Sequence, residues 1–415
     1  MDSSTATTTA TRRAGPARAR LSQPTAFAAI AAIFVVFTAA SAAPSPLYVV
    51  YQEAWDFSAT ALTFVFAIYV VGLVGSLLVV GALSDYIGRR PVLAGAIALE
   101  TVALIFFITA GDLTTLSIAR VLQGIATGAA MTTLGASLVD LNPPHAPGRA
   151  GLVSGVAPLG GLAIGALGCG ALVQYAPAPT HLVFALLLAG MVAAATIVAF
   201  MPETSSRKPG ARGSLKPRVG IPERIRPQVY ALVPILASSW ALGGIYLSLG
   251  PSVAASVFGV ASHLVGGLVV TLLCGTGALT AFLLRGWLIE RVLNLAAILL
   301  TAGLVVTLVA VELNLPLLAA AGTVVAGVGF GAAALGSFGT LADLALPDER
   351  GELFAVAFVI SYMAFSVPAV IAGFASSTSF GLRSTTLVYG AGVAVLAVIA
   401  MLTQRRINRR KELAA

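Results

Sequence analysis

Two long stretches of this chain contain no charged residue, and they limit the possible folds more than any other feature. No aspartate, glutamate, lysine or arginine occurs from Ala150 to Pro202 or from Pro227 to Leu284. Each stretch is long enough for two membrane-spanning helices of about 20 residues joined by a neutral turn. Only 10% of the 415 residues are charged, against roughly 25% in soluble domains. The sequence therefore predicts an all-α membrane protein with several spans.

Apolar segments of spanning length recur along the whole chain, and we predict twelve transmembrane helices. They lie at about 25–50, 59–82, 91–110, 114–139, 151–175, 181–201, 228–248, 262–284, 292–313, 316–341, 353–374 and 384–404. The longest polar segment is rich in Pro, Gly, Ser, Arg and Lys and separates six spans from six. We therefore expect an N-terminal tail (1–23), a first six-helix bundle (24–201), a flexible linker (202–227), a second bundle (228–404) and a C-terminal tail (405–415).

The positions of the cations predict the orientation of these spans. With both termini on the inner side, the inner segments carry 22 of the 24 lysine and arginine residues, so we expect cytoplasmic termini. No basic face with interleaved aromatic residues occurs, which argues against nucleic-acid binding. Arginine greatly outnumbers lysine in an Ala- and Gly-rich chain, which is typical of a GC-rich bacterial genome. The expected location is a bacterial inner (plasma) membrane.

The two halves of the chain repeat each other. An offset of 203 residues pairs Leu138–Leu141 with Leu341–Leu344 and Gly124 with Gly327. Span four and its exit loop are therefore duplicated as span ten. Because each repeat has an even number of spans, the halves should be parallel, with a substrate site between them near the membrane midplane.

A short charged segment, Gly81–Pro91, joins the second and third predicted spans. Its glycines allow close helix approach and a tight reversal, and an acid at a helix end can pair with a cation. The segment resembles the G-x-L-x-D-x-x-G-R-R/K loop of the major facilitator superfamily. The matching residues are Gly81, Leu83, Asp85, Gly88, Arg89 and Arg90.

Together with the twelve spans and the repeat, this resemblance covers almost the whole chain and implies two six-helix bundles that rock about a central cavity. It also implies that Asp85, Arg89 and Asp140 form a charge cluster that latches the halves in the outward-open state. The alternative is that these charges only anchor the loop at the membrane surface. In the second half Ala281 stands where Asp85 would be, so the latch is expected to be lopsided even though Asp343 matches Asp140.

Two charged residues lie deep within predicted spans, Glu100 in span three and Arg120 in span four. The segment around Arg120, R-V-L-Q-G, resembles the family's R-x-x-Q-G. A charge at such a depth costs at least ~2.5–3.5 kcal/mol on insertion scales, so both residues need partners. The helical rise places them at depths that long side chains can bridge. A proton-coupling role and a structural role remain open for each, and Glu53 and Asp56 at the outer mouth are further coupling candidates.

Span five is rich in small residues, among them Gly155, Gly161 and Gly165, and contains Pro158. It resembles the G-x(3)-G-P-x(2)-G-G signature of the superfamily's drug:proton antiporters. Aligned on Pro158, the chain matches the signature at Gly161 and departs from it at the other three glycines. Small residues at this spacing let helix backbones touch, and the proline kinks the span. Ordinary helix packing is the alternative to a signature of export.

Pro44 and Pro46 interrupt the first span, which membranes tolerate only beside protein or a water-filled cavity. Polar and aromatic side chains near this break and in the second half are candidates for the cavity wall. They are Phe34, Phe37, Thr38, Ser41, Tyr48, Tyr51, Gln123, Trp240, Tyr246 and Tyr362. Each alone is as typical of helix packing, but together they favour an apolar, aromatic cavity for neutral or lipophilic compounds.

These features predict a secondary transporter that exports small lipophilic molecules by proton antiport and alternating access. We expect a monomer that uses the proton gradient, contacts membrane lipids and needs no cofactor or metal. An importer of a small metabolite by proton symport is the nearest alternative, although polar substrates call for more hydrogen-bonding side chains. A membrane-embedded enzyme or a non-transporting scaffold is the alternative of another class. The sequence contains no convergent catalytic set and no phosphate-binding loop.

Overall fold

The structure is a computed structural model that describes residues 21–414 except 144, 147, 206, 218, 261, 347 and 348, with side chains also left out at 350 and 408–414. The described residues form helices and connecting loops. The helices of the first half are α1 (Gln23–Ala42), α2 (Pro44–Trp55), α3 (Ala59–Val80), α4 (Leu83–Ile87), α5 (Arg89–Ile108), α6 (Leu113–Asp140), α7 (Arg149–Tyr175) and α8 (Pro179–Phe200).

Two short elements follow in the linker, and seven longer helices form the second half. The linker contains α9 (Ala211–Ser214) and a 3-10 turn, η1 (Glu223–Ile225). The second half consists of α10 (Arg226–Ser248), α11 (Gly250–Ser256), α12 (His263–Leu283), α13 (Ile289–Leu313), α14 (Pro316–Leu344), α15 (Arg350–Ser376) and α16 (Gly381–Ala414).

Twelve helical segments of the described chain are long and apolar enough to span a membrane, which confirms the predicted number. Their ends lie within a few residues of the predicted ones, except that the first span extends to Trp55 and α16 continues to Ala414. The segment expected to be a C-terminal tail therefore prolongs the last helix. No glycine or proline follows Gly392, and Arg, Lys, Glu and Leu all favour helix.

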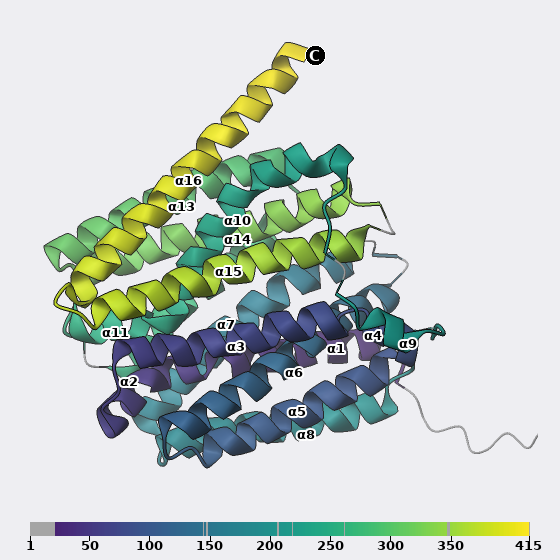
Figure 1. Ribbon diagram of the computed structural model, residues 1–415, viewed down its shortest axis with the longest axis horizontal. Coiled ribbons are helices and arrows are strands. Elements are labelled where there is room, and N and C mark those ends of the chain that lie inside the picture. The colour runs from purple at the N-terminus through teal and green to yellow at the C-terminus, as the bar shows by residue number, and fades with distance from the viewer. Residues whose placement is uncertain are drawn as a thin grey trace, which may run out of the picture.

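The helices form two bundles, one from α1–α8 and one from α10–α16 (Figure 1). The sequence repeat corresponds to a repeated packing contact. Gly124 of α6 lies against the Tyr69 carbonyl of α3, and its counterpart Gly327 of α14 lies against carbonyl groups of α12. A side chain at either glycine would collide with backbone atoms, which cannot move aside. This explains why glycine occurs at both positions of the repeat.

The bundles touch mainly through α7 against α12 and α3 against α15. We call the membrane face that carries the linker the linker side and the opposite face the distal side. Among the described residues, every hydrogen bond between the bundles lies at mid-depth or toward the distal side. These bonds join Ser45 to the Leu247 carbonyl (2.5 Å), Thr60 to Ser377 (3.0 Å), Gln174 to the His263 amide (3.0 Å) and to Ser262 (3.3 Å), and Thr271 to the Ala163 carbonyl (3.0 Å); Thr60 also reaches the Gly373 carbonyl (3.4 Å).

A close contact of α7 agrees with this distribution. Gly170, near the distal end, lies in backbone contact with Gly267 of α12. The structure is therefore a conformer that is closed on its distal side.

Candidate functional site: a charge cluster and a buried polar network

The charged loop forms an ion-pair cluster on the linker side. Arg89, at the start of α5, lies between two acids: it contacts Asp85 at 2.5 Å and Asp140, at the end of α6, at 3.0 Å. Its guanidinium also donates to the Ser84 hydroxyl at 2.6 Å. The structure thus brings together the three residues that the sequence predicts. All of them belong to the first bundle, so their action as a latch between the bundles stays a prediction.

The two glycines of this loop have different roles. Gly88 has φ +112°, a conformation that side chains disfavour, and it makes the reversal between α4 and α5. Gly81 has an ordinary helical φ of −52° and lies in the turn between α3 and α4, where a Cβ would collide with the Leu77 carbonyl oxygen.

Arg90, which was predicted to belong to the cluster, forms no ion pair with any described side chain. Its guanidinium donates to the carbonyl oxygens of Val198 (3.1 Å) and Ala199 (2.6 Å) at the end of α8. The last carbonyls of a helix have no partner within it and carry the negative end of the helix dipole. Arg90 therefore stabilises the end of span six.

The start of the linker binds to this cluster, which sequence reasoning missed. The Glu203 carboxylate accepts hydrogen bonds from the backbone amides of Arg89 (2.8 Å) and Arg90 (3.3 Å) at the free N-terminus of α5. Thr204 donates to Asp140 at 2.9 Å, and Ser205 donates to the Asp85 carbonyl at 3.0 Å. This part of the linker is therefore held in place, contrary to the expectation of a flexible segment.

Replacing Glu203 with alanine should lower the free energy of unfolding by about 1 kcal/mol, because the first amides of α5 lose their acceptor. Thermal unfolding of the purified protein measures the loss. Glu223→Ala is the matched control: this linker acid is 86% exposed and, among the described residues, pairs with Arg226, three residues later, and such pairs contribute about 0–1 kcal/mol. Equal losses in the two variants would contradict the capping role.

The described residues of the second bundle form no equivalent cluster. Ala281 replaces the acid, and Asp343 forms no ion pair with any described side chain. Instead Arg224 of the linker donates to the Leu344 carbonyl at the end of α14 (3.1 Å) and pairs with Glu349. The asymmetry expected from the sequence is thus present in the ion pairs.

If the cluster acts as a latch, Asp85→Asn should cut transport by about tenfold while membrane insertion stays intact. The substitution removes one ion pair to Arg89 but keeps an oxygen that can accept its hydrogen bond. Initial transport rates in vesicles with matched protein levels measure the effect. Glu312→Asn is the control, because this exposed acid at the distal end also pairs with a single arginine, Arg383. Normal turnover of Asp85→Asn would contradict the latch.

Glu100 and Arg120 belong to one polar network inside the first bundle, but they do not form an ion pair. Gln123 lies between them: its amide nitrogen donates to Glu100 Oε1 (3.0 Å), and its amide oxygen accepts from Arg120 (2.7 Å). All three side chains are buried. The expected direct contact is replaced by a chain of three residues, because Gln123 follows Arg120 by one helical turn and occupies the space between the charges.

The break in the first span supplies acceptors to this network. Pro44 lacks an N–H, so the Ala40 carbonyl loses its helical partner, and the Gln123 amide donates to it at 3.1 Å. Arg120 donates to the neighbouring Ser41 carbonyl at 3.1 Å and to the Tyr48 hydroxyl of α2. Arg120 is thus bonded to the backbone of the first span, as a structural role for it requires. The position of Ala40, four residues before Pro44, was a sequence signal for the contact with Gln123.

Aromatic rings surround Arg120 and exclude water from it. Its guanidinium lies 5.3 Å from the ring centres of Tyr48 and Tyr69 and 5.8 Å from that of Phe107. Within the described residues, Glu100 Oε2, Arg120 Nε and the Tyr51 hydroxyl are buried without a hydrogen-bond partner. Buried polar atoms without a partner are rare because they raise the free energy of the folded state. They mark positions where a bound proton or a rearranged side chain would form a new hydrogen bond.

Glu53 and Asp56 lie apart from this network. Both are exposed at the distal end of the first span, and Asp56 ends α2 in a left-handed conformation with φ +51°. The structure does not place them with Glu100 and Arg120, and a coupling role for either acid stays a prediction.

The small residues of α7 contact α1 only over part of the helix. A side chain at Gly161 would collide with Thr38, and one at Gly165 with the Ala39 backbone, so both are packing positions as expected. Pro158 lies inside α7 between its two ends. Gly155 has nothing within 4 Å, so its assignment to packing is wrong in this conformer. It lies in the part of α7 nearer the linker side, where the described residues form no hydrogen bond between the bundles.

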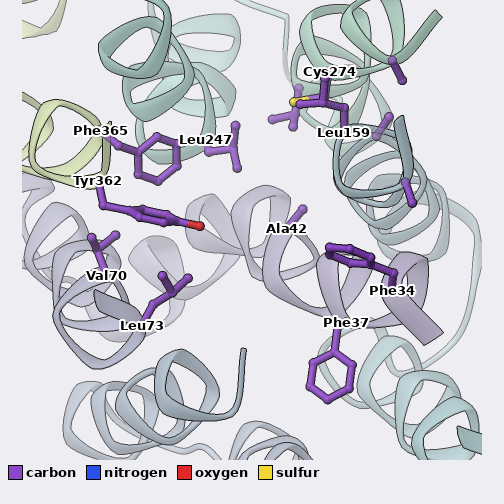
Figure 2. Packing of buried hydrophobic residues seen from close by; sticks show 14 of the residues in the cluster. Phe34, Phe37, Ala42, Val70, Leu73, Leu159, Leu247, Cys274, Tyr362 and Phe365 are labelled. Carbon is purple, nitrogen blue, oxygen red and sulfur yellow. The ribbon is translucent and has the colours of Figure 1, made fainter. Parts of the chain in front are cut away.

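Several predicted cavity residues have other positions. Ser41, Tyr48 and Gln123 belong to the buried network, Thr38 packs on Gly161, and Tyr51 stacks on Trp55 with ring centres 4.6 Å apart. In Figure 2 Phe37 points away from Tyr362 and Phe365, and its side chain is buried. Phe34 is also buried, within the common core. Tyr246 lines a separate cavity of the second bundle. The aromatic character was predictable, whereas the rotation of each helix was not.

Trp240 and Tyr362 do belong to an aromatic wall, and sequence reasoning missed its other members. Their rings lie 4.8 Å apart. The wall continues along one face of α15, whose aromatic residues are spaced by four, four and three positions, a pattern that the sequence contains. The further members are Phe338, Phe354, Phe358 and Phe365.

This wall faces the other bundle. Figure 2 shows Tyr362 next to Val70 and Leu73 of α3, and the ring centre of Phe365 lies 5.0 Å from that of Phe66. From this contact the wall extends toward the linker side, where the described bundles share no hydrogen bond. Trp240 and Phe358 are half-buried there.

Comparisons with known proteins agree with this architecture. The chain is similar over 92% of its length to a bacterial homologue of the human lysosomal transporter Spinster in an inward-facing conformation (13% identity, 97% of that chain, TM-score 0.68). It is also similar, again over 92% of its length, to the human organic anion transporter MFSD10 (TETRAN), with 17% identity, 100% of that chain covered and a TM-score of 0.67. A D-xylose–proton symporter is similar over the same share of this chain, with 14% identity, 97% of that chain covered and a TM-score of 0.73. At these identities the likeness shows the fold.

The family model described as Major Facilitator Superfamily matches residues 26–311, more than half of the chain. This match includes the charge cluster, the buried network and the first spans of the second bundle. The chain belongs to the major facilitator superfamily and is a multi-pass membrane transporter.

Proposed function

We propose that this transporter exports small, lipophilic, uncharged molecules in exchange for protons. The observation that carries the proposal is the aromatic wall of the second bundle, which contains no charged side chain and faces the first bundle. Apolar walls with few polar groups favour ligands that gain by leaving water. The excess of cations on the linker side supports a cytoplasmic position for this side. A conformer closed on the distal side would then load its substrate from the cytoplasm or the inner leaflet.

The side chains in and near the wall argue against anions and sugars as substrates. An anion would need an accessible cation, but Arg120 is 1% exposed and already has polar partners and aromatic neighbours. A sugar would need several hydrogen-bonding side chains, and the wall offers mainly phenylalanine rings. Relatives of this fold include an organic anion transporter and a sugar–proton symporter by name. We place this chain with neither substrate class.

The buried network supplies a means of proton coupling. Glu100 is the acid that lies at mid-depth among the described spans, and one of its oxygens has no partner. Protonation of Glu100 removes its negative charge, and Gln123 connects this carboxylate to Arg120 through hydrogen bonds. Arg120 in turn donates to the Ser41 carbonyl, next to the break between α1 and α2. Because Ser45 of α2 bonds the second bundle, protonation can change the relative stability of open and closed states. The proton shifts the equilibrium between the open and closed states by the difference between its affinities for the two states.

Expression in a bacterial host that lacks its own exporters tests this function. We expect resistance to a set of lipophilic, uncharged drugs, and loss of that resistance when a protonophore collapses the proton gradient. Resistance that persists without the gradient would contradict antiport. Accumulation of a polar metabolite that depends on the gradient would identify the importer instead.

Phe358→Ala should weaken binding of the exported compounds by about 1 kcal/mol, roughly fivefold in KM, because the wall loses a ring that contacts three others. Transport kinetics in vesicles measure the change. Phe374→Ala is the control on the same helix, since this ring is 63% exposed on the outside of the bundle. An equal KM for both variants would argue against the wall as the substrate surface.

A further inference from the structure

The distal half of the second bundle contains a half-open cavity of about 140 Å³, which we call the distal pocket. Helices α10–α14 line it, together with Thr386 of α16, and no residue of the first bundle contributes. It is therefore separate from the aromatic wall and from the space between the bundles. Leu268 and Pro316 line it and are exposed at the bundle surface, so it is reached from the surrounding lipid.

The chemistry of the lining excludes charged and strongly polar ligands. None of the lining residues is charged, and only Tyr246 and three threonines carry a polar side chain. Thr307, Thr323 and Thr386 each donate their hydroxyl proton to a carbonyl one turn earlier in their own helix, at 2.8–2.9 Å. Because the Thr323 proton is used in this way, Tyr246 must donate to Thr323 (2.8 Å). No hydroxyl proton of the lining is left for a ligand.

A cavity of this kind holds an apolar molecule better than water. A buried water typically makes about three hydrogen bonds, as donor and acceptor, and these walls offer only lone pairs. An apolar cavity of about 150 Å³ in another protein stays dry and binds benzene or xenon. We propose that the distal pocket binds a small, uncharged hydrophobic molecule of about the size of benzene, drawn from the membrane. This site is additional to the transported substrate's and does not depend on the proposed function.

The position of the pocket links its occupancy to closure of the distal side. Ile245, Tyr246 and Gly250 line it, and between them lies Leu247, whose carbonyl accepts the bond from Ser45 of the first bundle. α11, which also lines it, contacts α2. A molecule in the pocket packs against residues 245–250 on the side away from the first bundle. Its binding should therefore favour the conformer that is closed on the distal side.

Crystals of the full chain under xenon pressure test the binding directly. We expect xenon in the distal pocket of the parent protein and none in Ala320→Leu, whose larger side chain fills the cavity. Ala302→Leu, an exposed position on α13, is the matched control and should keep the xenon. Should Ala320→Leu fail to fold, Val265→Phe fills the same space from α12. Ordered water, a lipid chain continuing out of the pocket, or xenon retained in a filled variant would overturn the proposal.

A second measurement tests the effect on closure. A Thr60→Cys/Ser377→Cys pair, whose native hydroxyls lie 3.0 Å apart across the distal side, should form a disulfide when that side is closed. We expect benzene to raise the rate of disulfide formation at least twofold in the parent and the Ala302→Leu background, and to leave it unchanged with Ala320→Leu. An unchanged rate in the parent, or an equal rise with Ala320→Leu, would refute the link to closure.

Discussion

Replacing Gly267 with valine should hold the distal side open and abolish transport. A Cβ at this position of α12 would lie against the carbonyl group of Ala166 and the Cα of Gly170, so α7 and α12 could not approach as they do here. Backbone atoms cannot rotate away, and overpacking costs about 1–3 kcal/mol. Because about 1.4 kcal/mol changes a conformational equilibrium tenfold, the closed state becomes a minor species. A transporter that cannot close one side cannot complete its cycle.

Two measurements check this result. Disulfide formation in the Thr60→Cys/Ser377→Cys pair should slow at least tenfold in Gly267→Val, and transport should fall to background. Gly168→Val is the control on α7: it introduces the same residue type one turn from the other packing positions, but with nothing within 4 Å of the new Cβ. Disulfide formation at the parental rate together with intact transport would show that the bundles close by another contact.

Glu100→Gln should abolish transport driven by a proton gradient, with a loss of at least about 100-fold. Glutamine has the same shape and keeps an oxygen that accepts the Gln123 amide, so the protein should fold. A glutamine side chain cannot take up and release a proton, so the charge at position 100 stays constant through the transport cycle.

Exchange of labelled for unlabelled substrate, which needs no proton gradient, separates coupling from folding. We expect Glu100→Gln to keep this exchange while it loses gradient-driven transport. Glu53→Gln serves as the control acid, because Glu53 is exposed at the distal end and should leave both activities unchanged. Full gradient-driven transport by Glu100→Gln would exclude Glu100 as the coupling acid.

Much of the fold was predictable because it depends on properties of single segments. A span needs only enough consecutive apolar residues, and the charges that interrupt the runs place the loops. The offset between the halves located the duplicated glycines, and the structure has Gly124 and Gly327 in corresponding contacts. The loop motif likewise predicted that Asp85, Arg89 and Asp140 lie together, and their ion pairs confirm this.

The candidate site was less predictable because it depends on which side of each helix faces a neighbour. Lipid is as apolar as the interior of a bundle, so the sequence of a span carries little information about its rotation. This is why Tyr246 was assigned to the shared cavity although it lines a pocket of its own bundle. Phe358 was missed for the same reason, although it belongs to the aromatic wall.

For this protein the sequence by itself determined the class, the number of spans, the repeat and the family, since length, charge and local motifs suffice for these. Only the tertiary structure decided that Gln123 connects Glu100 with Arg120, that Glu203 of the linker caps α5, and that the distal side is closed. The Glu100–Gln123 and Ser45–Leu247 contacts join residues from different helices, and the Glu203 contact joins the linker to α5. Their depth and rotation are fixed by side-chain packing, which no single segment of the sequence specifies.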